Sequence, residues 1–404
     1  ASRGLGHVYK RQDKKLLSLI ILLFGIFSTL SAQEDNRITI KGVVVDATTG
    51  EPIPFANLGV LGTVAGVASD MDGNFELLLP LSLEKYKVRV SVVGYTSYEM
   101  NVEDVKGEEN MRIALKPVTY GIGEVDVYAE SLVYKKMIRQ VVENIGKNYL
   151  SKPYNYEGYF EYMTSEEDQP ARTKEAIVEI YDRTGYKRSD VQTAFKDLNY
   201  RFREVRRSED TGKVSDGLNY FDDILTADII RNTRNVLDIS NARDYKLKNK
   251  GRILYEGDSV QVIAYEVSEP ALSTSGDASV TSYSGEIYIH LKDLAVLKNV
   301  TYISAKDFNI LGRNLVAIDS PKQENVKMTI ITNYKKLNSA YFLSGITIQY
   351  TYKEGEKNKN GRMQYVTTRL NATNPEVFQG RMYYEDIETN RDFWENYTVY
   401  FQED

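Results

Sequence analysis

Few of the side chains that carry chemistry in proteins occur in this sequence. Cysteine is absent from all 404 residues, which excludes thiolate nucleophiles, disulfides and cysteine-bound zinc. Histidine occurs twice, as His7 and His290. A hydrolytic zinc centre needs two histidines and a carboxylate, and His7 lies in an N-terminal stretch that we expect to be removed. The sequence therefore predicts no metal site and no cofactor.

Acyl-transfer and glycoside chemistry are also poorly supported. A Ser-His-Asp triad would have to combine His290 with Ser282 or Ser284, and no Gly-x-Ser-x-Gly motif accompanies them. No phosphate loop or dinucleotide fingerprint occurs. A glycosidase needs only two carboxylates, but nothing singles out a pair among the 57 acidic residues. We therefore expect no catalytic residues and no enzyme.

One acidic motif is superficially similar to a calcium-binding loop. Asp70-x-Asp72-Gly73-Asn74 places two aspartates beside a glycine. A calcium loop of the EF-hand kind has its glycine after a third ligand and ends in a distant glutamate. Here Gly73 follows the second aspartate, and apolar runs flank the motif. The sequence thus predicts a hairpin turn in which Gly73 takes a positive φ.

The composition is that of a globular chain rich in β-structure. With 42% hydrophobic and 27% charged residues, a chain of 404 residues is long enough for two or three domains. Tyrosine is abundant at 31 residues, and its ring suits the half-buried face of a strand. The net charge of −6 makes nucleic acid a poor partner.

The N-terminal region has the pattern of an export signal. Lys14-Lys15 precede an apolar run, Leu16–Leu30, which is followed by Ser31-Ala32. A basic segment, an apolar segment and small residues at its end are typical of a secretory signal peptide. We expect cleavage after Ala32, with residues 1–13 preceding the signal. The alternative is an uncleaved anchor, although the run is shorter than the roughly 20 residues of a membrane span.

Short runs of Val, Ile and Leu, separated by Gly, Pro and Asp, fill the stretch from Ile38 to Leu115. Such runs predict strands joined by turns, and hence a small β-sandwich over residues 33–118. Four pieces resemble the carboxypeptidase regulatory-like domain: Gly42–Asp46, Gly50–Asn57, Ser69–Phe75 and Val93–Tyr95. The resemblance implies a seven-stranded, transthyretin-like sandwich without an active site. Domains of that family recur at the N-termini of outer-membrane proteins of Gram-negative bacteria, including TonB-dependent receptors.

A linker and a helix are expected to follow the sandwich. Residues 119–130 are the predicted linker, and its segment Gly123–Tyr128 resembles the one that follows the domain in those receptors. From Ser131, the expected N-cap, apolar residues recur at helical spacing up to Pro153. They are Met137, Ile138, Val141, Val142, Ile145 and Tyr149. We expect this helix to cover a sheet; the alternative is a helix that faces a partner or a membrane surface.

The remainder of residues 131–404 is predicted to be a large antiparallel sheet. The candidate strands are Tyr245–Tyr255, Val260–Val267, Gly285–His290, Ala295–Ile303, Val326–Leu337, Ala340–Lys353 and Gln364–Asn371. They are consecutive and joined by turns, which indicates a meander. We expect a curved, half-barrel-like sheet whose hollow side the helix fills.

The middle of this region, from Arg188 to Asp244, is expected to be irregular and charged. One or two short helices are predicted between Leu218 and Ile239. Arg201, Arg203, Arg206 and Arg207 lie close together, and in an acidic protein we interpret them as part of a solvated or partner-facing strand.

Two further resemblances concern the C-terminal region. Asn148–Tyr154 with Tyr159–Tyr162 is similar to exported proteins that join the same regulatory-like domain to a β-rich region, although the basic residue of their Phe-Tyr-Arg-Glu motif is missing here. The series from Tyr245 to His290 resembles periplasmic lipoprotein carriers, which are half-barrels with an apolar hollow. The tail Arg391–Tyr397 is similar to the usual ending of the exported proteins. Its aromatic residues Phe393, Trp394 and Tyr397 are candidate docking residues, onto the chain's own sheet or onto another subunit.

These observations predict a protein that binds rather than reacts. We expect a non-catalytic accessory protein, periplasmic and associated with the outer membrane, which serves a transport, secretion or assembly complex. Edge strands of the sandwich would pair with an extended partner segment, and peripheral contact with the membrane is part of this expectation. The alternatives are a carrier of lipid or apolar peptide, and a glycan-binding or glycan-cleaving module.

Overall fold

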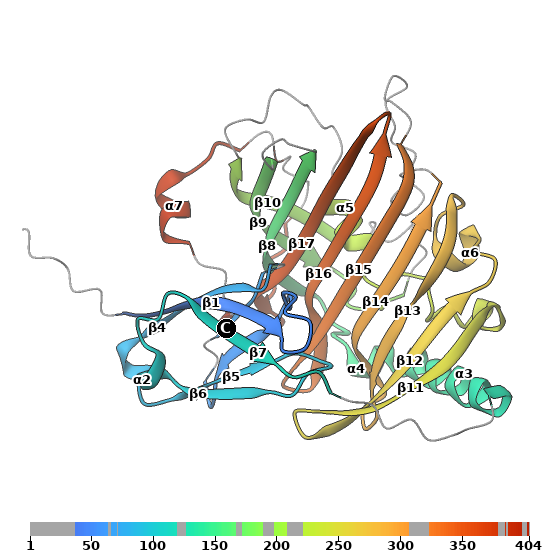
Figure 1. Ribbon diagram of the computed structural model, residues 1–404, viewed down its shortest axis with the longest axis horizontal. Coiled ribbons are helices and arrows are strands. Elements are labelled where there is room, and N and C mark those ends of the chain that lie inside the picture. Colours follow the sequence, from blue (N-terminus) through green and yellow to red (C-terminus); the bar gives the residue numbers. More distant parts are fainter. Residues whose placement is uncertain are drawn as a thin grey trace, which may run out of the picture. The chain divides into compact units, whose positions relative to one another are not determined.

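The computed structural model describes residues 37–63, 66–70, 72–118, 127–166, 172–188, 198–207, 221–306, 323–378, 384, 387–397 and 402–403. Ile38–Asp404 form one compact unit. In this unit a small β-sandwich precedes a large antiparallel sheet, which is accompanied by one longer helix and several short ones (Figure 1). The predicted signal peptide, residues 1–32, lies outside the described residues, as does the linker segment 119–126. No helix within the described ranges is long and apolar enough to cross a membrane.

The sandwich contains seven strands in its described residues, as predicted. One sheet has the order β4-β1-β7 and the other β3-β2-β5-β6. The strands are β1 (Arg37–Asp46), β2 (Asn57–Val60), β3 (Gly66–Ala68), β4 (Asn74–Pro80), β5 (Lys87–Ser91), β6 (Tyr98–Asn101) and β7 (Met111–Leu115), with two short helices, η1 (Leu81–Leu83) and α2 (Val102–Val105). Side chains of alternating residues, such as Ile40, Leu58 and Leu77, are fully buried between the sheets. This alternation is what a two-sheet core requires.

The turn at Asp70–Asn74 differs from the prediction. Gly73 has a φ of 74°, as expected, and the backbone N–H of Asn74 donates a 2.8 Å hydrogen bond to the Asp70 carboxylate. However, β3 pairs with β2 while β4 pairs with β1. The turn therefore crosses from one sheet to the other, and the predicted hairpin was wrong. The flanking runs alternate as hairpin strands do, but their pairing partners come from elsewhere in the chain.

The large sheet has the strand order β10-β9-β8-β17-β16-β15-β14-β13-β12-β11. Its strands are β8 (Tyr154–Glu166), β9 (Arg172–Asp182), β10 (Leu198–Arg207), β11 (Tyr245–Tyr255), β12 (Asp258–Val267), β13 (Val280–His290), β14 (Ala295–Ala305), β15 (Gln323–Leu337), β16 (Ala340–Glu354) and β17 (Lys357–Asn371). A short β18 (Gln402–Glu403) pairs with β17 in parallel. The meander predicted for Tyr245–Asn371 is confirmed, because β11 to β17 are antiparallel neighbours in chain order.

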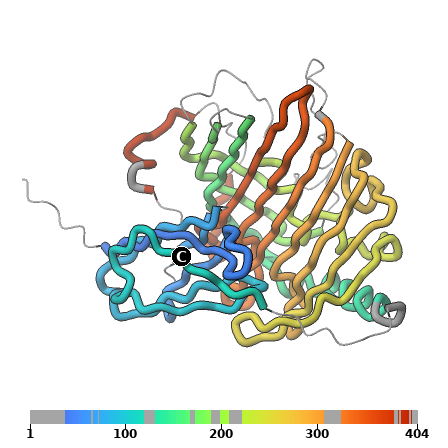
Figure 2. Tube along the Cα trace, viewed as in Figure 1, coloured from blue at the N-terminus to red at the C-terminus, as the bar shows by residue number. Residues whose placement is uncertain are grey.

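The strands β8, β9 and β10 extend this meander on its far side. β8 pairs with β17, so segments some two hundred residues apart lie side by side, green beside red in Figure 2. The arginine cluster lies on a strand, β10, as interpreted from the sequence, although residues 188–244 were otherwise expected to be irregular. α5 (Phe221–Thr226) lies within the range Leu218–Ile239 in which one or two short helices were predicted, and η2 (Ile239–Asp244) begins at the last residue of that range. Ala176, Val178 and Ile180 of β9 face the core, whereas Glu175 and Glu179 lie on the opposite face, where arginines of β10 pair with them.

The helix after the linker also differs in its bounds. α3 spans Val127–Glu143, so Ser131 lies inside it and is not its N-cap. A separate turn, α4 (Ile145–Asn148), follows. The predicted face is confirmed in part: Ile138, Val141, Ile145 and Tyr149 are buried, and Met137 and Val142 pack beside them. α3 packs against β11 and η2, so it covers a sheet as expected.

One face of the sheet, here called the core face, is covered by the chain's own side chains. α5 packs on β16 and β17, and its Phe221 ring meets Tyr200 at 4.9 Å and Tyr365 at 5.5 Å between centroids. Ile224, Ile230 and Leu237 belong to the same buried cluster. Segment 221–238 therefore covers this face of the sheet.

On the core face, two glycines lie beneath tyrosine rings of neighbouring strands. A Cβ on Gly158 would lie 2.3 Å from the Tyr365 ring, and one on Gly361 would lie 2.0 Å from the Tyr350 ring. A tyrosine of a neighbouring strand thus occupies the volume that the missing side chain leaves. Glycines covered by cross-strand aromatics are a means of bending a sheet without losing packing. They also account for some of the tyrosines noted in the composition.

Candidate binding cleft

A row of polar residues crosses the other face of the sheet, here called the outer face. The register pairs Arg206 with Glu175, Glu175 with Glu161, Glu161 with Gln364, and Gln364 with Thr347. The row therefore runs over β10, β9, β8, β17 and β16. Neighbours along these strands, such as Phe160, Met363 and Ile346, belong to the core. Because side chains alternate across a strand, the row lies on the opposite face.

Ion pairs hold the acidic members of this row. Arg206 donates from Nε and Nη2 to Glu175, each at 2.6 Å, and the Tyr159 hydroxyl donates to the same carboxylate at 2.7 Å. Arg362 donates from Nη2 to Glu161 at 2.6 Å and from Nη1 to Asp72 of the sandwich at 3.0 Å. Burial raises the pKa of the Glu161 carboxyl against the opposing effect of Arg362. The Asp70–Asn74 turn is thus tied to the sheet through an arginine.

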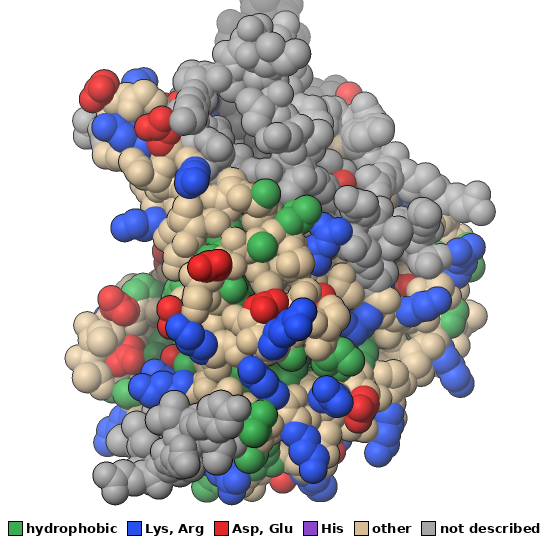
Figure 3. All heavy atoms as spheres, turned by 90° about the vertical axis from the view of Figure 1, so that its right-hand side faces the viewer, with side chains coloured by type: hydrophobic (Ala, Val, Ile, Leu, Met, Phe, Trp, Pro, Cys, Tyr) green, Lys and Arg blue, Asp and Glu red, His purple; other side chains and the backbone are tan. Residues whose placement is uncertain are grey.

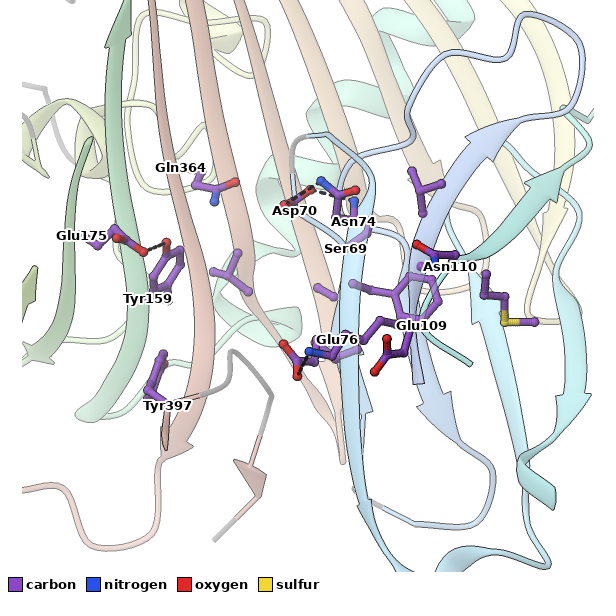
Figure 4. Close-up of a pocket in the computed structure, with 18 of the residues that line it drawn as sticks. Ser69, Asp70, Asn74, Glu76, Glu109, Asn110, Tyr159, Glu175, Gln364 and Tyr397 are labelled. Atoms are coloured by element: carbon purple, nitrogen blue, oxygen red, sulfur yellow. Dashed lines mark hydrogen bonds and ion pairs between the residues drawn. The ribbon is translucent and has the colours of Figure 1, made fainter. Parts of the chain in front are cut away.

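A cavity of about 620 Å³ lies between this row and the sandwich (Figure 4). Its lining includes Gln364, Tyr159 and Glu175 on one side, and Asn74 and Glu76 of β4 on the other. The volume falls in the range of about 300–1,000 Å³ that is typical of ligand sites. The cavity is therefore our candidate binding cleft.

Gln364 is the residue that distinguishes this cleft from an ordinary gap. Its side chain is 2% exposed, and its Oε1 accepts no hydrogen bond from the described residues. Its cross-strand neighbour Thr347 is equally buried, and its Oγ1 also lacks a partner among the described residues. A buried polar atom left without a partner costs about 1–3 kcal/mol. The amide carbonyl is thus placed to accept a hydrogen bond from a molecule in the cleft.

Acceptor groups dominate the lining of the cleft. Four carboxylates, those of Asp70, Glu76, Glu109 and Glu175, stand against two cations, Lys41 and Arg206. Burial raises the pKa of Asp70 above its ordinary value, although the Asn74 N–H opposes this effect. Lys41 pairs with Glu76 at 2.9 Å. The net charge of the lining is negative.

The predicted docking residues Phe393, Trp394 and Tyr397 gather on this same face. They belong to α7 (Arg391–Asn396) and the residue after it. Trp394 is 6% exposed, and its Nε1 donates to the Val205 carbonyl at 2.9 Å. Tyr397 stacks on Phe393 and on Tyr159, with centroids 5.0 and 6.4 Å apart. The aromatic tail thus packs on the chain's own sheet and lines the cleft through Trp394 and Tyr397. Docking onto another subunit stays a prediction.

The arginine cluster of β10 serves the same docking. Arg201 and Arg203 both pair with Glu179 of β9. The Arg201 guanidinium lies 4.3 Å from the Phe378 ring, and that of Arg206 lies 4.9 Å from Trp394. Arg203 and Arg206 are exposed, as expected for a solvated strand. Glutamates of β9 pair with the cluster, and the C-terminal segment lies on Arg201 and Arg206. The alternating glutamates of β9 were the signal that could have indicated this pairing.

The two serines considered for a triad lie far from His290. It lies on β13 together with Ser282 and Ser284, which are eight and six residues away along an extended strand, or about 20 Å or more at 3.4 Å per residue. Its ring is buried between Asp258 at 3.2 Å and Asp293 at 3.4 Å. The described residues contain no group of three or more His, Asp or Glu that could hold a metal ion.

Comparison with known proteins shows what the sandwich is similar to. Residues 40–127 match the CarboxypepD_reg-like domain family, so the resemblance stated from the sequence is confirmed for the sandwich. The TonB-dependent receptor SusC of Bacteroides thetaiotaomicron is 37% identical over 134 residues, which is 33% of this chain and 12% of the receptor. The TonB-dependent receptor P3 of Formosa agariphila is 25% identical over 43% of this chain and 16% of the receptor. Bacillopeptidase F of Bacillus subtilis is 29% identical over 39% of this chain and 11% of its own length. The chain thus spans only a small part of these relatives.

Solved structures include two with a distant likeness. One is a putative outer membrane lipoprotein-sorting protein domain from Vibrio parahaemolyticus, at a TM-score of 0.26 and 11% identity over 60% of this chain and 94% of that one. The other is the LolA superfamily protein NE2245 from Nitrosomonas europaea, at a TM-score of 0.22 and 7% identity over 60% of this chain and 94% of that one.

Proposed function

We propose that this chain is a non-catalytic binding protein of the cell envelope, an accessory subunit of an outer-membrane transport, secretion or assembly complex that holds a partner in the cleft. The observation that carries the proposal is the buried carbonyl of Gln364, which faces the cleft without a hydrogen-bond donor from the described residues. The envelope location is supported by the regulatory-like domain, whose relatives include proteins named as TonB-dependent receptors. The secretory signal expected in residues 1–32 agrees with it.

The polar row supports binding over a purely structural role. A contact that serves only to fix the sandwich to the sheet would be most stable with apolar or fully paired groups, because unpaired buried polar atoms cost free energy. Here two buried polar atoms, on the cross-strand neighbours Gln364 and Thr347, lack partners among the described residues, and the first of these residues lines a cavity. Local rules are commonly broken in this way at functional sites.

The other two hypotheses receive less support. A lipid carrier needs an open hollow, and on the core face Phe221, Ile230 and Leu237 occupy that space. A glycan site needs free aromatic faces, but the Trp394 ring lies against Arg206 and the Tyr159 ring against Tyr397. Neither is favoured by a specific observation.

The proposal is tested by crosslinking from inside the cleft. The chain has no cysteine, so Asn110→Cys, at a residue that lines the cleft, carries a photoreactive maleimide at one defined place. Lys248→Cys, at an exposed residue of β11, is the matched control. After irradiation of envelopes from the source organism and detergent extraction, we expect a covalent adduct to an outer-membrane protein from the first variant only. The same adducts from both variants, or none from either, would refute the proposal.

A further inference from the structure

We infer that the cleft takes an extended peptide, which adds a strand to the edge of β4 that none of the described strands pairs with, and places a lysine or arginine side chain before Gln364. The inference names the kind of partner for the proposed binding role and rests on that role. Three features support it: the edge of β4, the acceptor-rich lining and the distribution of charge over the molecule.

The first feature is the strand that borders the cleft. β4 is the terminal strand of the sheet β4-β1-β7, so β1 pairs with one of its edges. Its residues Asn74, Phe75 and Glu76 line the cleft. Figure 4 shows Asn74 and Glu76 facing Gln364, Tyr159 and Glu175 across the gap. A terminal strand presents backbone N–H and C=O groups that an extended peptide can pair with.

The second feature is the mismatch between acceptors and donors. The Gln364 carbonyl needs a donor, and four carboxylates in the lining stand against two cations. An ammonium or guanidinium group supplies several N–H donors together with the missing positive charge. A charge-assisted hydrogen bond of this kind is about twice as strong as a neutral one. A basic side chain therefore matches the cleft better than a neutral or acidic one.

The third feature is the positive charge on a side of the molecule away from the cleft. The view of Figure 3 shows lysine and arginine side chains gathered over the side that carries β11 and α6. Lys246, Lys248 and Arg252 are exposed there on β11. Like charge keeps a basic peptide away from that side, whereas the cleft attracts it. The electrostatic field of the protein thus favours one site over the other.

The test uses capped heptapeptides with six randomised positions and a fixed central residue. The central residue is arginine, lysine, citrulline or glutamate, and a second arginine set carries N-methyl groups at alternate positions. Each set is panned against the chain from residue 33 onward. We expect arginine and lysine sets to yield binders at least about tenfold tighter than the other two, since citrulline keeps the shape of arginine but loses its charge. N-methylation should abolish binding, because strand pairing needs the N–H groups.

Two variants locate the binding. Gln364→Leu removes the acceptor, and Glu109→Lys reverses one exposed charge of the lining without touching the core. Each should weaken the best arginine peptide about tenfold, whereas Lys248→Met on β11 should leave its affinity unchanged. The fluorescence of the single tryptophan, Trp394, checks that each variant is folded.

Three outcomes would overturn the inference. They are equal affinity for the four central residues, tolerance of N-methylation, and binding of neutral oligosaccharides in place of every peptide set. If the crosslink from Asn110→Cys still captures a partner in such a case, the binding role stands and only the peptide class falls. If neither experiment finds a partner, both proposals fall.

Discussion

Replacing Arg231 by an uncharged residue should lower the free energy of unfolding of the large sheet more than almost any other single substitution. Its guanidinium is buried and pairs with the fully buried carboxylate of Asp182. The same Nη2 donates to the Tyr154 hydroxyl at 2.6 Å, and the group lies 4.9 Å from the Tyr186 ring. The ion pair joins segment 221–238 to β9, so it holds this segment on the core face of the sheet.

The size of the effect follows from what remains after the change. In Arg231→Met the Asp182 carboxylate keeps two backbone donors, the N–H groups of Thr184 at 2.9 Å and Gly185 at 3.1 Å, but no positive charge within its ion pair. Removal of one partner from a buried pair costs about 3–5 kcal/mol. The double variant Asp182→Asn/Arg231→Met removes both charges of this pair, so it should be more stable than Arg231→Met by about 2 kcal/mol or more.

Chemical denaturation followed by fluorescence measures this cycle. Trp394 is the only tryptophan and its indole is bonded to β10, so its emission reports the large sheet together with the cleft that it lines. Arg203→Met, at an exposed arginine of β10, is the control and should cost less than about 1 kcal/mol. The reasoning is wrong if Arg231→Met lowers the free energy of unfolding by no more than this control does. It is also wrong if the loss in the double variant equals the sum of the losses in Arg231→Met and Asp182→Asn.

Three further predictions concern single residues. Burial lowers the pKa of Lys298 to about 8, although Glu286 opposes the shift. Between pH 8 and the ordinary lysine pKa of about 10.4, the unfolded chain therefore binds more protons than the folded one, so the free energy of unfolding should rise with pH in that window. In urea titrations, this dependence on pH should become weaker in Lys298→Met and stay unchanged in Lys248→Met. Trp394→Ala removes a buried ring and the bond to Val205, so hydrogen exchange of residues 391–397 should speed up at least tenfold, and unchanged exchange would show that the tail is held by other contacts. Gly158→Ala puts a Cβ 2.3 Å from the Tyr365 ring and should lower the melting temperature by several degrees, since overpacking costs about 1–3 kcal/mol, whereas Gly146→Ala meets nothing within 4 Å and should not.

Sequence patterning located most of the strands because each strand buries one face. Tyr245–Tyr255 was predicted with the bounds that β11 has, and the bounds of β12, β14, β15 and β16 were predicted to within three residues. β13 and β17 begin five and seven residues before their predicted starts. β9 was missed, although its Ala176, Val178 and Ile180 are core residues. Its other face carries Glu175 and Glu179, and a strand with charged residues on one face is hard to tell from a loop until its partners on β10 are known.

The cleft could not be predicted, for a related reason. Glu161 and Gln364 occupy the outer positions of their strands, where polar residues normally indicate contact with water. Only the position of the sandwich, tied through Asp72 to Arg362, turns this face into a buried one. The tail was easier to interpret, because a single tryptophan beside Phe393 indicates an anchor whatever surface it meets.

The tail and the cleft share the same residues, so they must be linked energetically. Arg206 holds Glu175 in the polar row and at the same time lies on the Trp394 ring. Tyr159 bonds Glu175 and stacks on Tyr397. A ligand that engages Glu175 therefore acts on groups that also keep the tail docked, and by linkage any preference of the ligand for the docked tail strengthens both interactions by the same factor. Release of the tail would remove two of the residues that line the cleft, Trp394 and Tyr397, and would lower affinity without any change to Gln364.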